Sequence, residues 1–291
     1  MAVMHRVYDR ITFIFDPLHN FYEHEQLHRK LSAALVLLFV VNLLVIELKR
    51  RQLLPAPLAE LVPGNHFYAV QAAFSLILVL EVISLIFVLP CSFSSSLGKQ
   101  FEILSLILIR NAFKELSYFP EPITYLGNEE KILHILSNGF GALLIFGLLG
   151  LYYKIQTRTE ESSHGVDLYG FVAAKKGISL LLLSAFFVMG GYSVTKIPAG
   201  QEQADFFHDF YTLLILTDIL IVLISQCFHP SAKFVFRNSG YALATLMIRI
   251  ALVAPVYFNV LLGSAAIGFA ICLSLVSNHL FAETKASSSA L

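Results

Sequence analysis

Tryptophan is absent from this chain of 291 residues, and charged residues make up only 14% of it, against roughly 25% in an average soluble domain. So few charges cannot cover the surface of a water-soluble protein of this length. The charges also cancel, so no excess of either sign favours nucleic acid or an acidic partner. The scarcity therefore excludes an ordinary soluble domain and argues against a nucleic-acid-binding protein.

Cysteine is also rare, and Cys91, Cys227 and Cys272 form neither a C-x-x-C pair nor a zinc-type spacing. We interpret these cysteines as small apolar packing residues. Without tryptophan, any aromatic belt at a membrane surface must consist of tyrosine and phenylalanine.

Apolar residues are abundant, at 57% of the chain, and the mean hydropathy is +0.72. They gather in eight stretches, each about the length that a helix needs to cross a bilayer. The sequence therefore predicts an all-α, polytopic integral membrane protein whose main partner is the lipid bilayer. Pro255 ends the seventh stretch, although one bent helix could replace the last two. The stretches are residues 31–48, 66–90, 100–118, 132–154, 171–193, 207–228, 238–254 and 259–279.

Lysine and arginine outside these spans set the expected orientation. They are more numerous at the two termini and in the second, fourth and sixth loops than in the other loops. By the positive-inside rule, both termini lie in the cytoplasm and the protein is multi-pass in the plasma (inner) membrane. The basic run "KRR" at 49–51 in the first loop argues the other way.

The second and sixth spans carry an acid at the same place. One reads "FSLILVLEVISLI" with Glu81, and the other reads "YTLLILTDILIVL" with Asp218. In the spans that follow, "LILIRNA" matches "TLMIRIA", which places Arg110 opposite Arg249. This similarity predicts two four-helix repeats, which share orientation because four crossings is an even number.

The repeats define the expected domains. The first is 31–157 and the second is 158–280. An amphipathic segment at 1–30 precedes them, with apolar residues at helical spacing, and a disordered tail at 281–291 follows. We expect the amphipathic segment to lie on the inner membrane surface. The alternative is a helix that packs on the base of the protein itself.

The acids and arginines are spaced so that each pair meets near the middle of the membrane. Each pair would lie at matched distances from the turn between its two helices, so we expect Glu81 to contact Arg110 and Asp218 to contact Arg249. Such a pair can fix helix register without any transport role. It can also line an ion or proton path or respond to voltage. Nearby polar residues that could take part are Asn111, Thr217 and Thr245.

Three short patterns recur in one known family. The first span contains Asn42 and ends near Glu47, the second runs from Phe74 to Glu81, and the third begins near Phe101 and Glu102. These patterns resemble the first three helices of the voltage-sensor domain of cation channels. The resemblance implies a shared bundle fold that handles ions. That family carries Arg or Lys at every third residue of its fourth helix, whereas 132–154 has none before Lys154. Steep voltage gating is therefore not implied.

The stretch "HEQLH" at 24–28 matches the zinc motif H-E-x-x-H. On a helix His24 and His28 would share a face, with Glu25 as a general base. The motif lies in a charged stretch before the first span, and no second motif of an intramembrane protease follows. We therefore interpret it as a solvated or interfacial helix, and we expect no bound metal and no cofactor.

One side of the fourth and eighth spans consists largely of small residues, which favours close packing between repeats or protomers. They include Gly139, Gly141, Gly147, Gly150, Gly263, Ser264, Ala265, Gly268 and Ala270. The leading hypothesis is a non-enzymatic ion channel or transporter subunit with a buried acid–arginine pair in each repeat. The second is a structural or accessory subunit, as a homo-oligomer or with other membrane proteins. A membrane metalloprotease that uses HEQLH is a distant third.

Overall fold

A computed structural model describes residues 2–55, 62–156, 165–196, 206–228 and 232–288. The described part is helical throughout and contains no strand. Its elements are α1 (Ala2–Glu23), α2 (Glu25–Arg50), α4 (Phe67–Val88), α5 (Phe93–Lys114), the short 3-10 helix η1 (Glu115–Tyr118), α6 (Glu129–Ile155), α7 (Gly165–Lys196), α8 (Phe206–Phe228), α9 (Ala232–Val253) and α10 (Phe258–Ser288).

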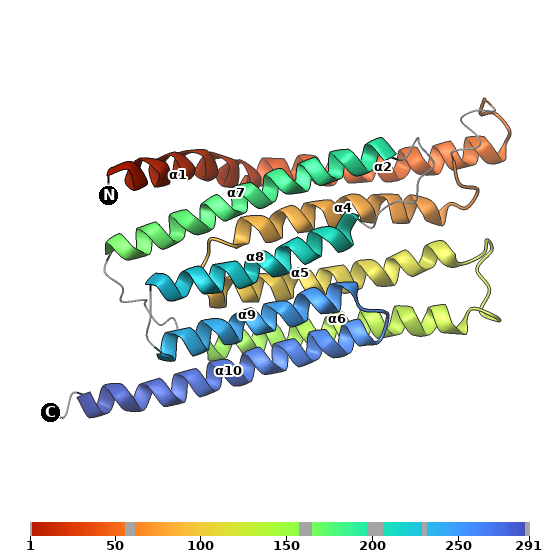
Figure 1. Cartoon of the computed structure of the whole chain (residues 1–291). Helices are drawn as coiled ribbons and strands as arrows, with labels where there is room; N and C mark the ends of the chain where they lie inside the picture. Colours follow the sequence, from red (N-terminus) through yellow and green to blue (C-terminus); the bar gives the residue numbers. More distant parts are fainter. Residues whose placement is uncertain (1, 56–61, 157–164, 197–205, 229–231, 289–291) are drawn as a thin grey trace.

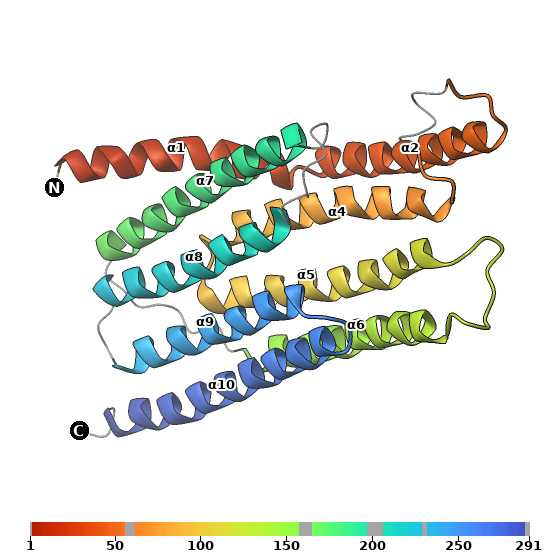
Figure 2. The same ribbon diagram turned by 45° about the vertical axis from the view of Figure 1, so that its right-hand side comes forward.

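The helices form two layers with the same order (Figure 1). In one layer α2 packs on α4, α4 on α5, and α5 on α6. In the other α7 packs on α8, α8 on α9, and α9 on α10. Successive helices within each layer run in opposite directions, and α2 and α7 run the same way. The layers meet mainly through α5 with α9 and α6 with α10, and Figure 2 shows the same order from a second side.

Each of the eight predicted apolar stretches falls on one of these helices. α9 and α10 are separate antiparallel helices on either side of Pro255, so the alternative of one bent helix is wrong. Six of the described helices are long and apolar enough to cross a membrane, namely α2, α4, α6, α7, α8 and α10. α5 and α9 lie between neighbours on several sides.

The interior has two hydrophobic clusters, and α5 belongs to both. One joins α5 and α6 to α9 and α10 through side chains such as Leu104, Ile145 and Ile267. The other joins α4 and α5 to α7 and α8 through side chains such as Val82 and Leu214. The outer faces stay apolar as well, and among the apolar side chains of α2 only Ile46 is buried. Such a surface fits lipid as its solvent.

Glycine lets α6 and α10 approach each other closely. A Cβ atom at Gly141 would lie 2.4 Å from Val260, and one at Gly263 would lie 2.7 Å from Ile145. Neither position has room for a larger residue without movement of its neighbour. The small residues of the fourth and eighth spans thus mark a contact between these two helices. Others among them, including Gly147 and Gly150, have no atom within 4 Å of where a Cβ would be.

α1 runs alongside α7 rather than across the end of the bundle (Figures 1 and 2). Asp16 forms an ion pair with Lys176 at 2.6 Å, and Phe15 packs against Phe87 of α4. These contacts match the alternative placement for the amphipathic segment, a helix packed on the protein itself. The start of α1 and the far end of α10 lie at the same end of the bundle.

Candidate functional site

Asp218 of α8 and Arg249 of α9 form an ion pair inside the protein. The Nε of Arg249 donates to Oδ2 of Asp218 at 3.4 Å. The arginine is fully buried and the aspartate is 9% exposed. The two Nη atoms of Arg249 have no hydrogen-bond partner among the described residues. The pair is therefore held through one nitrogen and lacks the two-point geometry of a strong arginine–carboxylate bond.

The contact expected between Glu81 and Arg110 is not formed. The guanidinium of Arg110 donates from Nη2 to Oδ1 of Asn111 at 3.0 Å instead. Its Nε, and Oε2 of Glu81, are buried without a partner in the described structure. The two charges still act on each other through space.

The turn between α4 and α5 lies earlier than predicted. α4 ends at Val88 and α5 begins at Phe93, several residues before the start predicted for the third span. Arg110 therefore lies about ten residues farther from the turn than Glu81, or about 15 Å along the helix axis at 1.5 Å per residue. Equal depth was the basis of both expected pairs, but Arg249 also lies farther from its turn than Asp218 and that pair forms, so distance from the turn does not by itself decide the contact.

Tyr211 of α8 lies among these charges. Its side chain lies near Arg110, Arg249 and Glu81. The residue is buried, and its side chain makes further contacts within the protein. It shares a face of α8 with Asp218, two helical turns away. Sequence reasoning used Tyr211 only to align the repeats, although its spacing from Asp218 was a usable signal.

A cavity of about 370 Å³ lies where α5 and α9 end, between the two layers. We call it the Arg110 cavity. Its polar lining comes largely from one stretch of α5 and η1, and its apolar lining comes from both layers. The lining residues are Leu78, Ile107, Arg110, Asn111, Lys114, Glu115, Tyr211, Leu252, Val253, Ala254, Pro255, Val256 and Asn259.

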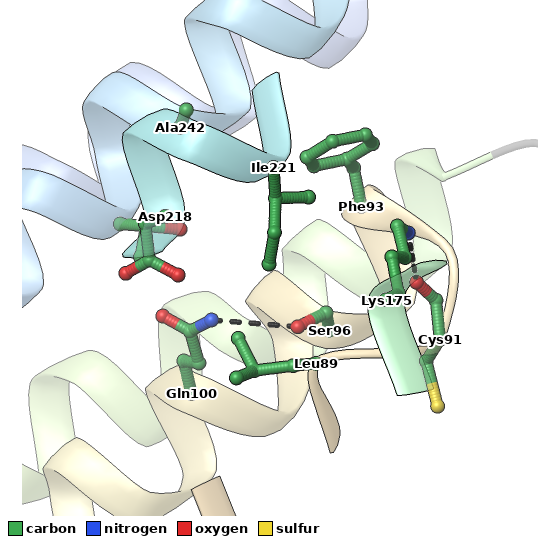
Figure 3. Close-up of a pocket in the computed structure, with 10 residues that line it drawn as sticks. Leu89, Cys91, Phe93, Ser96, Gln100, Lys175, Asp218, Ile221 and Ala242 are labelled. Carbon is green, nitrogen blue, oxygen red and sulfur yellow. Dashed lines mark hydrogen bonds between the residues drawn. The ribbon is translucent and has the colours of Figure 1, made fainter. Parts of the chain in front are cut away.

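A second cavity lies toward the other end, where α4 turns into α5 (Figure 3). We call it the Asp218 cavity. Its volume of about 20 Å³ is enough for one water molecule. Figure 3 shows the Asp218 carboxylate facing the side chain of Gln100, whose amide nitrogen donates to Ser96 at 3.4 Å. The Gln100 oxygen has no partner in the described structure.

Lys175 of α7 also lines the Asp218 cavity and is only 3% exposed. Its ammonium donates to the backbone oxygen of Cys91 at 2.8 Å and lies over the rings of Phe93 and Phe171. This buried cation was missed in the sequence. The signal was a lysine one helical turn after a phenylalanine inside an apolar span, which suits a cation–π contact.

The polar residues predicted around the pairs divide into two groups. Asn111 lines the Arg110 cavity and Thr245 lines the Asp218 cavity. The hydroxyl of Thr217 donates to the backbone of its own helix at Leu213. The other three lie away from both cavities. Asn42 bonds Leu38 within α2, Glu47 pairs with Arg51 and His66, and Glu102 pairs with Lys99 and Tyr153.

The HEQLH stretch does not form a continuous helix. His24 lies at the break between α1 and α2, and its side chain accepts from the backbone nitrogen of Gln26 as an N-cap. His28 lies one turn into α2 with its ring against Tyr22. His24 and His28 therefore do not present one helical face, contrary to the geometry that the motif requires. Within the described residues, no group of three or more His, Cys, Asp or Glu side chains is placed to hold a metal ion.

Comparisons with protein-family models, curated proteins and solved structures find no match to this chain. The fold and the composition define its class, an all-α protein with several helices able to cross a membrane.

Proposed function

We propose that this protein is a channel or transporter subunit that moves an ion or another small solute across the plasma membrane. In this proposal all eight helices from α2 to α10 cross the bilayer and both termini are cytoplasmic. The two layers are then two parallel four-helix repeats. The identical helix order and direction in both layers support this interpretation.

One observation carries the proposal: a buried charge pair is flanked by a cavity toward each end of the bundle. The Asp218 cavity includes the acid of the pair, and the Arg110 cavity includes Tyr211, which lies near its arginine. Charges at this depth are costly in a membrane protein and usually mark a path for ions or protons. Polar cavities on both sides reduce the barrier that a solute would meet.

The cavities are separated by a packed zone. Leu214 lies between Tyr211 and Asp218 on α8 and is fully buried. On α5, Leu104 and Ile107 are buried between Gln100 and Arg110. A solute can pass only if this zone opens, as in alternating access between two repeats. Voltage would influence such a movement weakly, because one charge moved through the whole field contributes about 2.3 kcal/mol per 100 mV.

The test is flux through liposomes that contain the purified protein. Asp218→Asn should reduce the flux strongly because it removes the charge of the pair and leaves Arg249 buried. Asp209→Asn is the matched control, because Asp209 lies on the same helix but is exposed. The proposal is wrong if wild-type liposomes pass no ion or organic solute at any potential.

The second candidate is a scaffold or accessory subunit. It is favoured by the outer face of α6, where a Cβ atom added at Gly139, Gly147 or Gly150 would have no other atom within 4 Å. Small residues on a membrane helix permit another helix to approach closely. Native mass spectrometry should then detect a homo-oligomer or a copurified membrane protein, and Gly147→Leu should dissociate it.

A further inference from the structure

The Arg110 cavity contains two cations on one face of α5. Arg110 and Lys114 are four residues apart and both line the cavity. Like charges at this spacing repel each other and destabilise a helix. Two such side chains in one cavity therefore need an explanation in terms of what neutralises them.

The protein itself neutralises these two cations only in part. The side-chain hydrogen bond of Arg110 goes to the uncharged amide of Asn111, and its Nε is buried without a partner in the described part of the chain. Glu81 acts on Arg110 through space without contacting it. Lys114 makes no ion pair with any residue that the structure describes. One acid, Glu115, lines the cavity with the two cations, and its neighbour His134, at 3.6 Å, is charged only when protonated.

Apart from Tyr211 and Asn259, the rest of the wall is apolar. Leu78 and Ile107 contribute from one layer, and Leu252, Val253 and Val256 contribute from the other. A volume of about 370 Å³ falls within the usual range of sites for small organic ligands. A few polar groups among apolar side chains are also typical of such sites.

We propose that the Arg110 cavity binds an anion with a short apolar body, a carboxylate or a phosphate. Arg110 and Lys114 hold the anionic group, because a guanidinium and an ammonium suit carboxylate and phosphate oxygens. The apolar wall holds the body. Only Glu115 offsets Arg110 and Lys114 in the wall, so a cation would meet an excess of positive charge there, and a neutral molecule would leave that excess in place.

Tyr211 connects this ligand to the buried pair. It lines the cavity and lies near Arg249 as well as Arg110. An anion bound at Arg110 would therefore change the field at the Asp218–Arg249 pair. That the bound anion is also the transported solute rests on the proposed function.

The experiment is isothermal titration calorimetry on the full chain in a neutral detergent, with hexanoate as the probe. Hexylammonium and hexanol serve as the cationic and neutral probes of equal length. Hexanoate should bind saturably, and the other two should not. Arg110→Gln and Lys114→Gln should each weaken hexanoate about tenfold or more, as loss of a charge-assisted bond predicts. Lys99→Gln, an exposed change at the other end of α5, should leave binding unchanged.

A second arm distinguishes a free organic acid from a lipid headgroup. Native mass spectrometry compares retention of phosphatidylglycerol with that of phosphatidylcholine. If phosphatidylglycerol is retained by the wild type, lost in Lys114→Gln and displaced by hexanoate, the natural anion is a lipid headgroup. Hexanoate binding without such retention identifies a free acid. Either result supports the anion site.

The inference is overturned if all three six-carbon probes bind alike, or if both variants bind hexanoate as the wild type does. Arg110→Lys is a second variant in case Arg110→Gln does not fold. It keeps the positive charge, so it should retain part of the affinity for hexanoate. If hexanoate binds but no flux is found, the proposed function is wrong and the anion site is still supported. If flux is found but no hexanoate binding depends on Lys114, the anion site is wrong and the proposed function is still supported.

Discussion

Tyr211 and Asp218 lie two turns apart on the same face of α8, and each lines a different cavity. At 1.5 Å per residue the separation is about 10 Å along the helix axis. The same arginine, Arg249, forms an ion pair with Asp218 and lies near Tyr211. One face of α8 therefore runs from one cavity to the other, past Arg249 of α9. The buried side chain of Leu214 lies on α8 between the two cavities.

The two arginines should differ in how much their charge matters for stability. Arg249→Met leaves Asp218 buried without its partner and should lower the free energy of unfolding by about 3–5 kcal/mol. Arg110→Met should cost less, because Arg110 borders a cavity and is not in contact with Glu81. Denaturant unfolding in detergent measures both.

The double change Asp218→Leu with Arg249→Met is the control for this comparison. It removes both charges together and should recover most of the stability that Arg249→Met loses. If the double variant is no more stable than the single one, the pair is not the cause of the loss.

The contact between α6 and α10 offers a matched pair of glycine changes. Gly141→Ala places a methyl group 2.4 Å from Val260, so it should cost about 1–3 kcal/mol through overpacking. Gly147→Ala meets no atom within 4 Å, and alanine favours a helix over glycine by about 1 kcal/mol. Gly147→Ala should therefore raise the melting temperature, while Gly141→Ala lowers it. The same direction of change in both variants would contradict this packing.

Much of the helical layout could be predicted from the sequence, because runs of apolar residues report directly on bilayer-length helices. The start of α5 could not. Ser92 caps that helix by accepting from the backbone nitrogen of Ser95, but "SFSSS" has the composition of a loop. Composition identifies the apolar core of a helix better than its ends.

Pairing between helices was harder to predict than the helices themselves. Spacing around a turn predicts depth but not which way a side chain points, and Arg110 bonds to Asn111 rather than to Glu81. The contact between Asp218 and Arg249 does form. The cavities join residues from both layers, and no local pattern in one sequence reports how layers stack.

Glu121 gives a pH-dependent contact outside the membrane-spanning helices. Burial acts to raise the pKa of its carboxyl, but hydrogen bonds from His66 and the charges of His66 and Arg50 outweigh it, so the pKa is lowered. A lowered pKa gives stability that is present above the ordinary value for glutamate, about 4.3, and is lost as the pH falls through the folded value. The melting temperature of the wild type should fall below about pH 4, and Glu121→Gln should reduce this fall. An identical acid profile for both proteins would contradict the prediction.

The HEQLH stretch should carry no stoichiometric zinc. His24 caps α2 at a break in the helix, so His24 and His28 do not present one face for a shared metal. Elemental analysis of protein purified without chelator should find well under one zinc per chain. Zinc near one per chain that is lost in His24→Ala would restore the metalloprotease hypothesis.

The two cavities should differ in the side of the membrane from which they can be reached. Val256 lines the Arg110 cavity, at the end of the bundle opposite the start of α1, and Thr245 lines the Asp218 cavity toward the other end. Each is changed to cysteine in a background where the native cysteines Cys91, Cys227 and Cys272 are serine. With a small, membrane-impermeant methanethiosulfonate, Val256→Cys should react quickly, and only from outside if both termini are cytoplasmic.

Thr245→Cys should react only from the cytoplasmic side. It should react more slowly, because the Asp218 cavity holds about one water molecule in this conformation. Leu214→Cys, in the packed zone between the cavities, should stay unlabelled from either side at rest. Sealed vesicles of both orientations measure the three rates. If Val256→Cys and Thr245→Cys are labelled from the same side, the cavities do not lie on opposite sides of the barrier, and transport through this bundle is wrong. If a bound solute makes Leu214→Cys reactive, the packed zone opens during transport, as alternating access requires.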